Sequence, residues 1–390
     1  MKMNKSVMNR GFIPHGLKKT FLIVIATLFL PSILAAQNAA SGMGEQYTVN
    51  NLVSSVIGPT ENGDSSLVNP WGIACSSTGG PWWVVDKGKG RATVYSEAGI
   101  SFPGLAPLVV AIPATPSNMA YNSTPTGIVF NSTTSFQLAA GVPSQFIFVT
   151  GDGAIAGWSS AIGRYNAVLV VDNYSDAAYT GVAIGSINGE NVLYSANFRQ
   201  GRVDIFGRDF GPRFLSPNAF TDLLMPEDFS PYNVQNINGR IYVAYAKPGA
   251  EGTEAEIGAG SGYVDAFDRN GNLIMRFMEG PWMNAPWGIA QAPMGFGDYS
   301  GFLLVGNSGS GRIAAFDMES GDFVGYLRDR QGMAITIPGL HALSFGNNGL
   351  AGPASTLYFS ADNSIFGLIR ADTTVEESYS RPLTEPYTLP

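Results

Sequence analysis

The stretch Asn69-Pro70-Trp71-Gly72-Ile73-Ala74 returns almost unchanged as Ala285-Pro286-Trp287-Gly288-Ile289-Ala290 later in the 390-residue chain. Weaker copies of this motif occur at residues 125–129, 179–183, 231–235 and 339–343. The residues aligned with Trp71 occupy positions 71, 126, 180, 232, 287 and 341, so the spacing stays between 52 and 55 residues. Such a regular period indicates an architecture built from repeated structural units.

Each repeat continues with two β-rich runs joined by a short turn that contains Asp or Asn together with Gly. In the first repeat, the runs Trp82-Trp83-Val84-Val85 and Ala92-Thr93-Val94-Tyr95 flank the turn Asp86-Lys87-Gly88-Lys89-Gly90. Runs of this kind around Gly-containing turns are typical of antiparallel hairpins. A fourth run, such as residues 108–112, leads into the next repeat. The pattern predicts an all-β fold, a six-bladed β-propeller with four antiparallel strands in each blade.

The two ends of the repeat region predict how the ring closes. The last repeat contains three strand-like runs, at 342–345, 356–360 and 365–370, and then becomes polar. A strand-like run at 47–53 precedes the first repeat and can supply the missing fourth strand. We therefore expect the N-terminal strand to complete the last blade, which would pair the open sheet edges.

The predicted organisation is a signal peptide (1–36), a short leader (37–46), the propeller (47–372) and a polar C-terminal tail (373–390). The first segment has a basic region ending in Lys18 and Lys19, an apolar run at 21–30, and small residues before Gln37, as in secretory signal peptides. The apolar run is shorter than the roughly 20 residues that a membrane-spanning helix needs. We expect a secreted monomer, periplasmic or extracellular, without a membrane anchor.

Charge and residue counts exclude several classes of function. Removing the five basic residues of the signal segment leaves 17 Lys and Arg against 30 Asp and Glu, so no electrostatic footprint for nucleic acid is expected. The mature chain would keep one cysteine, Cys75, and one histidine, His341. These cannot form a three-His zinc site, and a Ser-His or Cys-His dyad could use only His341. A bound metal would be a hard cation such as calcium, held by oxygen ligands.

The connectivity of a propeller places the starts of the inner strands and the turns between second and third strands on the same face of the disk. The residues aligned with Trp71 would therefore surround one mouth of the central channel. Aromatic rings beside amides favour a surface that binds sugars or peptides, whereas rings that only wedge between blades are the alternative. The candidate ligand-binding residues are Trp71, Thr126, Thr180, Tyr232, Asn233, Trp287 and His341.

A calcium site on the same face is a weaker hypothesis. Asp and Asn before Gly also form turns without any ligand, and the loop at 172–176 lacks the Asp-x-Asp-x-Asp-Gly pattern. The segment 248–262, which carries three Glu residues, is expected to be a mobile acidic excursion of the fourth blade. The candidate metal ligands are Asp86, Asp152, Asp172, Asn173, Asp176, Asn197 and Asn307.

An ordered series of motifs across residues 47–370 resembles a family of exported bacterial proteins of unknown function, some of which carry a PEP-CTERM sorting tail. The motifs are NLV at 51–53, LVNPWGIA at 67–74, PTGIVFN at 125–131, DGAIAGW at 152–158, YSANF at 194–198 and FGN at 345–347. The resemblance implies a six-bladed propeller related to NHL and gluconolactonase-like folds, without an established activity. The chain departs from the family at Gly151, where an acidic residue is common, and at His341, where Trp is expected. The sorting tail is absent, which favours free secretion.

The leading functional prediction is recognition of an extracellular glycan, peptide or protein at the channel mouth. The alternative is a calcium-dependent lactonase or related hydrolase of the gluconolactonase type, in which a metal polarises the substrate and orders a water. Such enzymes use a buried Glu/Asn/Asn/Asp set near the channel. Because no matching Glu can be placed in this sequence, the residues favour binding over catalysis.

Overall fold

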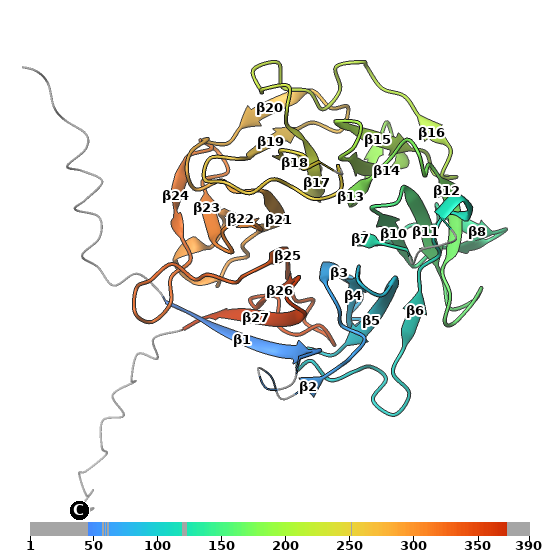
Figure 1. Ribbon diagram of the computed structural model, residues 1–390, viewed down its shortest axis with the longest axis horizontal. Helices are drawn as coiled ribbons and strands as arrows, with labels where there is room; N and C mark the ends of the chain where they lie inside the picture. Colours follow the sequence, from blue (N-terminus) through green and yellow to red (C-terminus); the bar gives the residue numbers. More distant parts are fainter. Residues whose placement is uncertain are drawn as a thin grey trace, which may run out of the picture. The chain divides into compact units, whose positions relative to one another are not determined.

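Six blades surround a central axis in the computed structural model, each built on four antiparallel strands, and one of the six sheets carries a short fifth strand at its edge (Figure 1). The structure describes residues 46–372 except 57, 59, 61, 119–122 and 251. They belong to one compact unit, Gly44–Pro390. The predicted signal peptide, all of the predicted leader except its last residue, and the predicted tail lie outside the described residues. The six-bladed, all-β propeller predicted from the repeat is confirmed.

In blades one to five, the four strands pair in the order in which they occur along the chain. Blade one contains β3 (Pro70–Cys75), β4 (Trp82–Asp86), β5 (Arg91–Tyr95) and β6 (Val109–Ala111), and blade two contains β7 (Pro125–Phe130), β10 (Phe146–Thr150), β11 (Ala154–Trp158) and β12 (Val168–Asp172). Blade three contains β13 (Tyr179–Ile187), β14 (Glu190–Asn197), β15 (Arg202–Phe206) and β16 (Pro212–Arg213). Blade four contains β17 (Ser230–Ile237), β18 (Arg240–Ala246), β19 (Tyr263–Phe267) and β20 (Leu273–Arg276), and blade five contains β21 (Pro286–Gln291), β22 (Leu303–Asn307), β23 (Ile313–Phe316) and β24 (Phe323–Tyr326).

Few other elements occur in the described part of the chain. A short hairpin of β8 (Gln137–Ala139) and β9 (Val142–Pro143) projects from blade two. Helical structure among these residues is limited to two 3₁₀ turns, η1 (Pro116–Asn118) and η2 (Gly297–Tyr299). Within the same residues, no helix has both the length and the apolar character required to cross a membrane.

Blade six joins strands from both ends of the described chain. It consists of β25 (Leu340–Phe345), β26 (Leu357–Ala361), β27 (Ile365–Ala371) and β1 (Tyr47–Ser54). β1 runs antiparallel to β27, as Figure 1 shows, and the short β2 (Asn62–Gly63) pairs with its outer edge. The predicted closure of the ring by the N-terminal strand is therefore confirmed.

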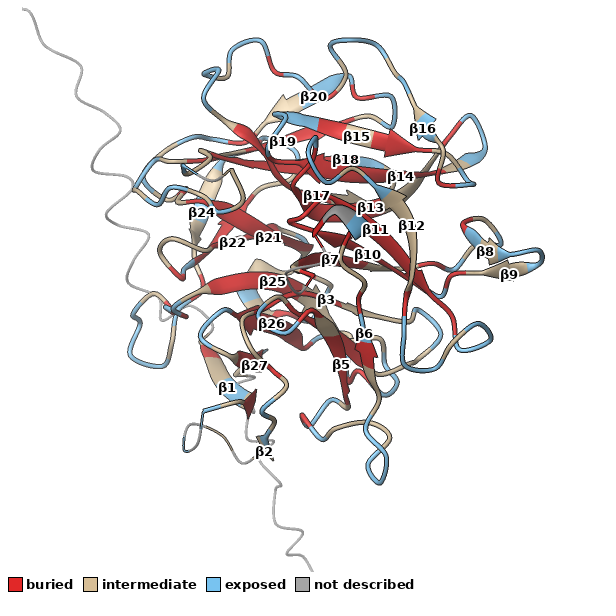
Figure 2. Ribbon diagram, turned by 45° about the vertical axis from the view of Figure 1, so that its right-hand side comes forward, coloured by how far each residue is buried: buried red, intermediate tan, exposed pale blue. Residues whose placement is uncertain are grey.

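The hydrophobic core lies between neighbouring blades. The second strands β4, β10, β22 and β26 are buried at every position, whereas the fourth strands β20 and β24 are half-buried or exposed (Figure 2). Between blades one and two, for example, Trp83 stacks on Phe146 with ring centroids 4.4 Å apart. Aromatic and β-branched residues fill these interfaces because each sheet is apolar on both faces.

In most blades a small residue follows the position aligned with Trp71, because neighbouring inner strands approach each other closely there. A Cβ on Gly288 would lie 2.5 Å from the main-chain oxygen of His341, and one on Gly72 would lie 2.7 Å from that of Thr126. Blade four departs from the pattern with Asn233, whose side chain occupies the space that Gly181 leaves in blade three. The glycines therefore permit the tight packing of strands around the axis.

Candidate functional site

The residues aligned by the sequence repeat converge on the axis near the starts of the six inner strands. We call this set the axial plug. Every side chain in it is buried. The plug consists of Trp71, Thr126, Thr180, Tyr232, Trp287 and His341.

The aromatic members of the plug pack on one another. Trp71 stacks on the His341 ring with centroids 4.2 Å apart, and meets Tyr232 and Trp287 edge-on at 6.0 and 6.1 Å. Such offset and edge-on contacts stabilise aromatic pairs beyond the burial of their area. Because these rings cover one another, they close this end of the channel.

Hydrogen bonds link the plug across different blades. The Trp287 indole N–H donates to the main-chain oxygen of Thr180 over 3.0 Å, and Asn233 Nδ2 donates to that of Trp287 over 2.7 Å. Thr126 Oγ1 donates to the main-chain oxygen of Tyr179 over 2.6 Å. These bonds join blades two to five and hold the plug side chains in fixed orientations.

The structure brings all seven candidate ligand residues together at one end of the channel, as the repeat predicts. Trp71, Trp287 and His341 are only 1, 5 and 3% exposed, which agrees with the alternative of rings wedged between blades. Burial lowers the pKa of His341 to about 3, so its imidazole is neutral at physiological pH. Contact of this set with a ligand stays a prediction.

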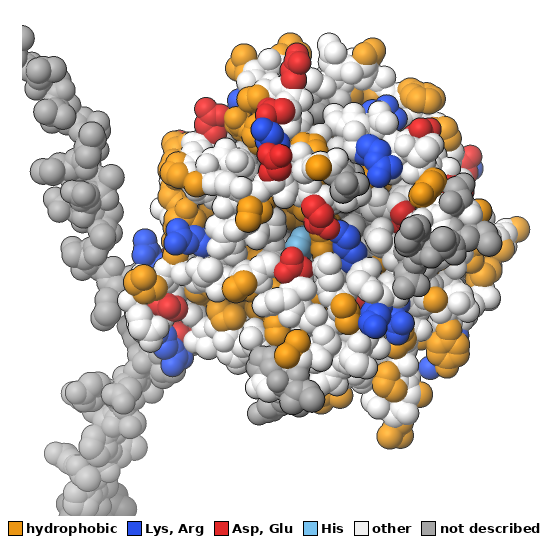
Figure 3. Space-filling view, viewed as in Figure 1, with side chains coloured by type: hydrophobic (Ala, Val, Ile, Leu, Met, Phe, Trp, Pro, Cys, Tyr) orange, Lys and Arg blue, Asp and Glu red, His pale blue; other side chains and the backbone are white. Residues whose placement is uncertain are grey.

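A loop of blade four covers the plug. We call residues 247–250 and 252–262, between β18 and β19, the strap. Glu254 of the strap forms an ion pair with Lys87 of blade one, and the Lys87 ammonium lies 4.1 Å from the centroid of the Trp71 ring. Ala255 packs against the cluster that contains Trp71 and Tyr232. Figure 3 shows acidic and basic side chains around a histidine at the centre of this face. The segment expected to be an acidic excursion thus reaches across the channel mouth.

Three of the candidate metal ligands are occupied in hydrogen bonds within their own blades. Asp86 accepts from Thr93 Oγ1 over 3.0 Å, and burial raises the pKa of Asp86 well above its ordinary value. Asn197 Nδ2 donates to Asp204 over 2.8 Å. Asn307 Oδ1 accepts from the main-chain N–H of Asn284 over 2.7 Å. These contacts tie the three side chains to other residues of the same blades.

The other four candidate metal ligands belong to blade two or to the loop after it: Asp152 lies in the turn between β10 and β11, Asp172 ends β12, and Asn173 and Asp176 follow β12. Asp152 accepts from the main-chain N–H of Thr124 over 3.3 Å. Asp172 and Asp176 accept from Tyr174 N–H and Ser175 Oγ, and Asn173 donates to Tyr179. No group of three or more His, Cys, Asp or Glu suited to a metal ion occurs among the residues that the structure describes. Calcium binding through Asn and Asp oxygens stays a prediction.

A polar pocket of about 450 Å³ lies on the strap's side of the propeller, and we call it the face pocket. Arg199 Nη1 donates to the main-chain oxygens of Tyr174 and Ala177 over 3.3 and 3.2 Å, and Tyr174 is 38% exposed. Sequence reasoning missed both residues, although both lie in turns that it had singled out for their Asp and Asn. The lining residues are Asn118, Thr124, Gly151, Asp152, Tyr174, Ser175, Arg199 and Thr253.

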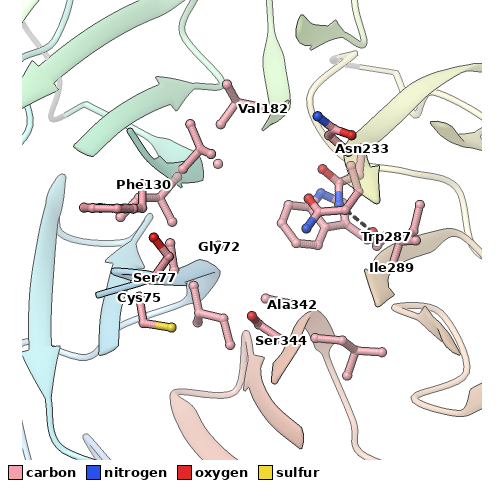
Figure 4. A pocket seen from close by; sticks show the side chains of 18 of the residues that line it. Gly72, Cys75, Ser77, Phe130, Val182, Asn233, Trp287, Ile289, Ala342 and Ser344 are labelled. Carbon is pink, nitrogen blue, oxygen red and sulfur yellow. Dashed lines mark hydrogen bonds between the residues drawn. The ribbon is translucent and has the colours of Figure 1, made fainter. Parts of the chain in front are cut away.

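A second cavity of about 470 Å³ occupies the channel beyond the plug, and we call it the channel pocket. Residues of all six inner strands line it, and Trp287 and Asn233 lie at its inner end. Figure 4 shows these two residues on one side of a central space, with Cys75 and Ser77 on the other. Residues of the repeated motif line this cavity, but sequence reasoning placed a ligand at the mouth of the channel and did not propose a cavity further along it.

Comparison with known sequences identifies relatives but no activity. The chain matches no known protein-family model. It is 30% identical over 308 residues to the uncharacterised protein R648 of Acanthamoeba polyphaga mimivirus, covering 76% of this chain and 73% of R648. It is 34% identical over 236 residues to the uncharacterised protein R640 of the same virus, but spans only 42% of R640. These relatives are viral, so they do not support the expected bacterial origin.

Two solved structures share the fold. A protein of unknown function from Bacteroides thetaiotaomicron has a TM-score of 0.52 and 12% identity, over 84% of this chain and 76% of that one. A glucose dehydrogenase has a TM-score of 0.50 and 13% identity, over 83% of this chain and 99% of that one. At such identities the likeness concerns the fold alone. The chain therefore belongs to the same family as R648 of the mimivirus, and its fold is a six-bladed β-propeller.

Proposed function

We propose that this protein is a secreted binding module that recognises an extracellular glycan in the face pocket. The observation that carries the proposal is the lining of that pocket, where an exposed Tyr174 ring lies among hydroxyl, amide, carboxylate and guanidinium groups. Sugar hydroxyls both donate and accept hydrogen bonds, which such a mixed lining satisfies. The Tyr174 ring supplies an apolar surface for the C–H face of a sugar. Export follows from the predicted signal peptide.

The lining supports a glycan better than a peptide. A peptide side chain needs an apolar pocket as an anchor, and Tyr174 is the one large apolar side chain in the described lining. The pocket volume of about 450 Å³ suits one or two sugar units, since ligand pockets commonly enclose roughly 300 to 1,000 Å³. A short oligosaccharide is therefore the favoured ligand.

The lining also supports binding over glycoside hydrolysis. Most glycosidases use two carboxyl groups on either side of the scissile bond. Among the described lining residues Asp152 is the one carboxylate, and its oxygens already accept from Asn118 Nδ2 over 3.2 Å and from Thr124 N–H over 3.3 Å. Asp152 therefore orders the rim of the pocket rather than serving as half of a catalytic pair.

A glycan array probed with the mature protein tests the proposal, followed by calorimetry with the strongest oligosaccharide. Arg199→Ala and Tyr174→Ala should each weaken binding at least about tenfold, since each removes a charged donor or a stacking surface. Arg208→Ala and Tyr165→Ala are matched controls, because both side chains are exposed and lie outside the face pocket. Binding to peptides but to no glycan would refute the proposal, as would unchanged affinity in both pocket variants.

A further inference from the structure

We propose that the channel pocket is a second binding site, specific for a small neutral polyhydroxylated molecule of one or two sugar units. It is separate from the face pocket and does not depend on the function proposed there. The two cavities share no lining residue.

The channel pocket is closed at one end and open at the other. Its lining begins at Trp287 and Asn233, beside the axial plug. It continues along the inner strands to Ser77 and Ser132, which are exposed in the loops that follow β3 and β7. Those loops leave the opposite ends of the inner strands from the plug, so the pocket opens on the face away from the strap. A ligand would enter from that face and stop at the plug.

The lining is uncharged, which selects for a neutral ligand. Among the described residues that line the cavity, none is Asp, Glu, Lys, Arg or His. A charged group placed there would lose its hydration without gaining a partner of opposite charge, which is costly. The cavity therefore discriminates against uronic acids and amino sugars of the same size.

Several polar groups in the lining have capacity for new hydrogen bonds. The side chains of Ser77, Ser132, Gln235 and Ser344 make no hydrogen bond to any residue that the structure describes. A hydroxyl can donate and accept, and the Gln amide offers both a donor group and an acceptor oxygen. These are the complements of a polyhydroxylated ligand, and they come from four different blades, one, two, four and six.

Other polar groups in the lining are already fixed in place. Asn236 Nδ2 donates to the main-chain oxygen of Ile184 over 2.8 Å, and its Oδ1 accepts from Gly239 N–H over 3.0 Å. Asn233 is held by its bond to the main-chain oxygen of Trp287. Since these amides are bonded to the framework, the cavity keeps its shape without a ligand, which lowers the entropic cost of binding.

Chemical modification of Cys75 can show whether a ligand occupies the channel pocket. It is the sole cysteine of the chain and lines the wall of the cavity. Burial raises the pKa of its thiol to about 12, so a small methanethiosulfonate reagent will modify it slowly enough to follow. A molecule bound in the channel would block the approach of the reagent.

The experiment measures the rate of Cys75 modification in the wild-type protein with a panel of neutral mono- and disaccharides, and with uronic acids and amino sugars of matched size. At least one neutral sugar should slow the reaction tenfold or more at saturation, and the charged sugars should not. Ser344→Val and Gln235→Leu should each weaken that sugar's affinity at least tenfold by calorimetry. Arg208→Ala, which is exposed and lies outside both pockets, should leave it unchanged.

Three results would overturn the proposal: no neutral sugar of the panel slows Cys75 modification, charged sugars slow it equally, or Ser344→Val and Gln235→Leu retain wild-type affinity. The modification assay uses the unaltered protein, so it decides the question even if a variant fails to fold. The face-pocket proposal is tested separately. It would fail if Arg199→Ala kept the wild-type affinity for the array glycan, and that result would leave the protection of Cys75 by neutral sugars unchanged.

Discussion

Trp287 of blade five donates its indole N–H to the main-chain oxygen of Thr180 in blade three, 3.0 Å away. The two blades are not neighbours, because blade four lies between them. One side chain thus ties together two blades that share no sheet-to-sheet interface. The consequence is that the plug residues act on the stability of the whole ring.

Replacing Trp287 with Ala should lower the free energy of unfolding by about 3 to 5 kcal/mol, because it leaves a cavity and an unpaired carbonyl oxygen. Urea denaturation followed by circular dichroism measures this. Trp282→Ala is the matched control, since Trp282 is half-buried and stacks on Phe323 at the rim, so its loss should be smaller. Wild-type stability of Trp287→Ala would show that the plug does not support the fold.

Gly288→Ala should destabilise the protein by about 1 to 3 kcal/mol, because the added methyl group meets the backbone of the neighbouring blade. The contact would be 2.5 Å from the main-chain oxygen of His341, which cannot move without displacing β25. Gly104→Ala is the control, since nothing lies within 4 Å of its Cβ position. Thermal melting of the pair measures the difference, and equal melting temperatures would contradict the close approach of the inner strands.

Acid should weaken the fold through His341. Burial lowers the pKa of this imidazole from 6.5 to about 3, so between those values the unfolded chain binds a proton that the folded chain does not. The stability that depends on neutral His341 is therefore complete above pH 6.5 and is lost as pH falls toward 3. His341→Phe keeps a ring against Trp71 and removes this titration. The difference in unfolding free energy between variant and wild type should therefore shift in favour of the variant as pH falls, whereas a constant difference would contradict the prediction.

Tyr47→Ala should lower the free energy of unfolding by about 3 to 5 kcal/mol, because it removes a buried ring from the strand that closes the propeller. The Tyr47 hydroxyl donates to the main-chain oxygen of Phe296 over 2.9 Å, and the two rings lie 5.0 Å apart. Asn50→Ala, in the same strand but exposed, should change stability by less than about 0.5 kcal/mol. Chemical denaturation measures the free energy of unfolding of both variants. If Asn50→Ala lowered it more than Tyr47→Ala does, the buried ring of Tyr47 would not be what stabilises the closing strand.

The fold could be predicted because similar residues recur at equivalent positions of the blades, where neighbouring strands pack in the same way. Gly72 and Gly288 mark equivalent close approaches, and the turn at 86–90 recurs in altered form in the other blades. The missing fourth strand of the last repeat also predicted the pairing of β1 with β27. These features are periodic or local, so a single sequence displays them.

The environment of the site could not be predicted in the same way. The repeat places Trp71 and His341 at one end of the channel, but their stacking at 4.2 Å depends on how rings from different blades meet at the axis. The contact of Glu254 with Lys87 joins an insertion of one blade to a turn of another. The roles of Arg199 and Ser344 could not be inferred from the sequence, because the residues that line each pocket with them come from distant parts of the chain.

The pairing of β1 with β27 also sets the order in which this protein can fold. The two strands have the largest sequence separation of any paired strands in the described chain, so blade six contributes strongly to a high contact order and to slow folding. During synthesis, the edge of β1 that pairs with β27 stays open until β27 has emerged, and it is then available to other strands. A chain that meets a second copy at that stage can exchange β1 with it, and such an exchange is a route to a domain-swapped dimer.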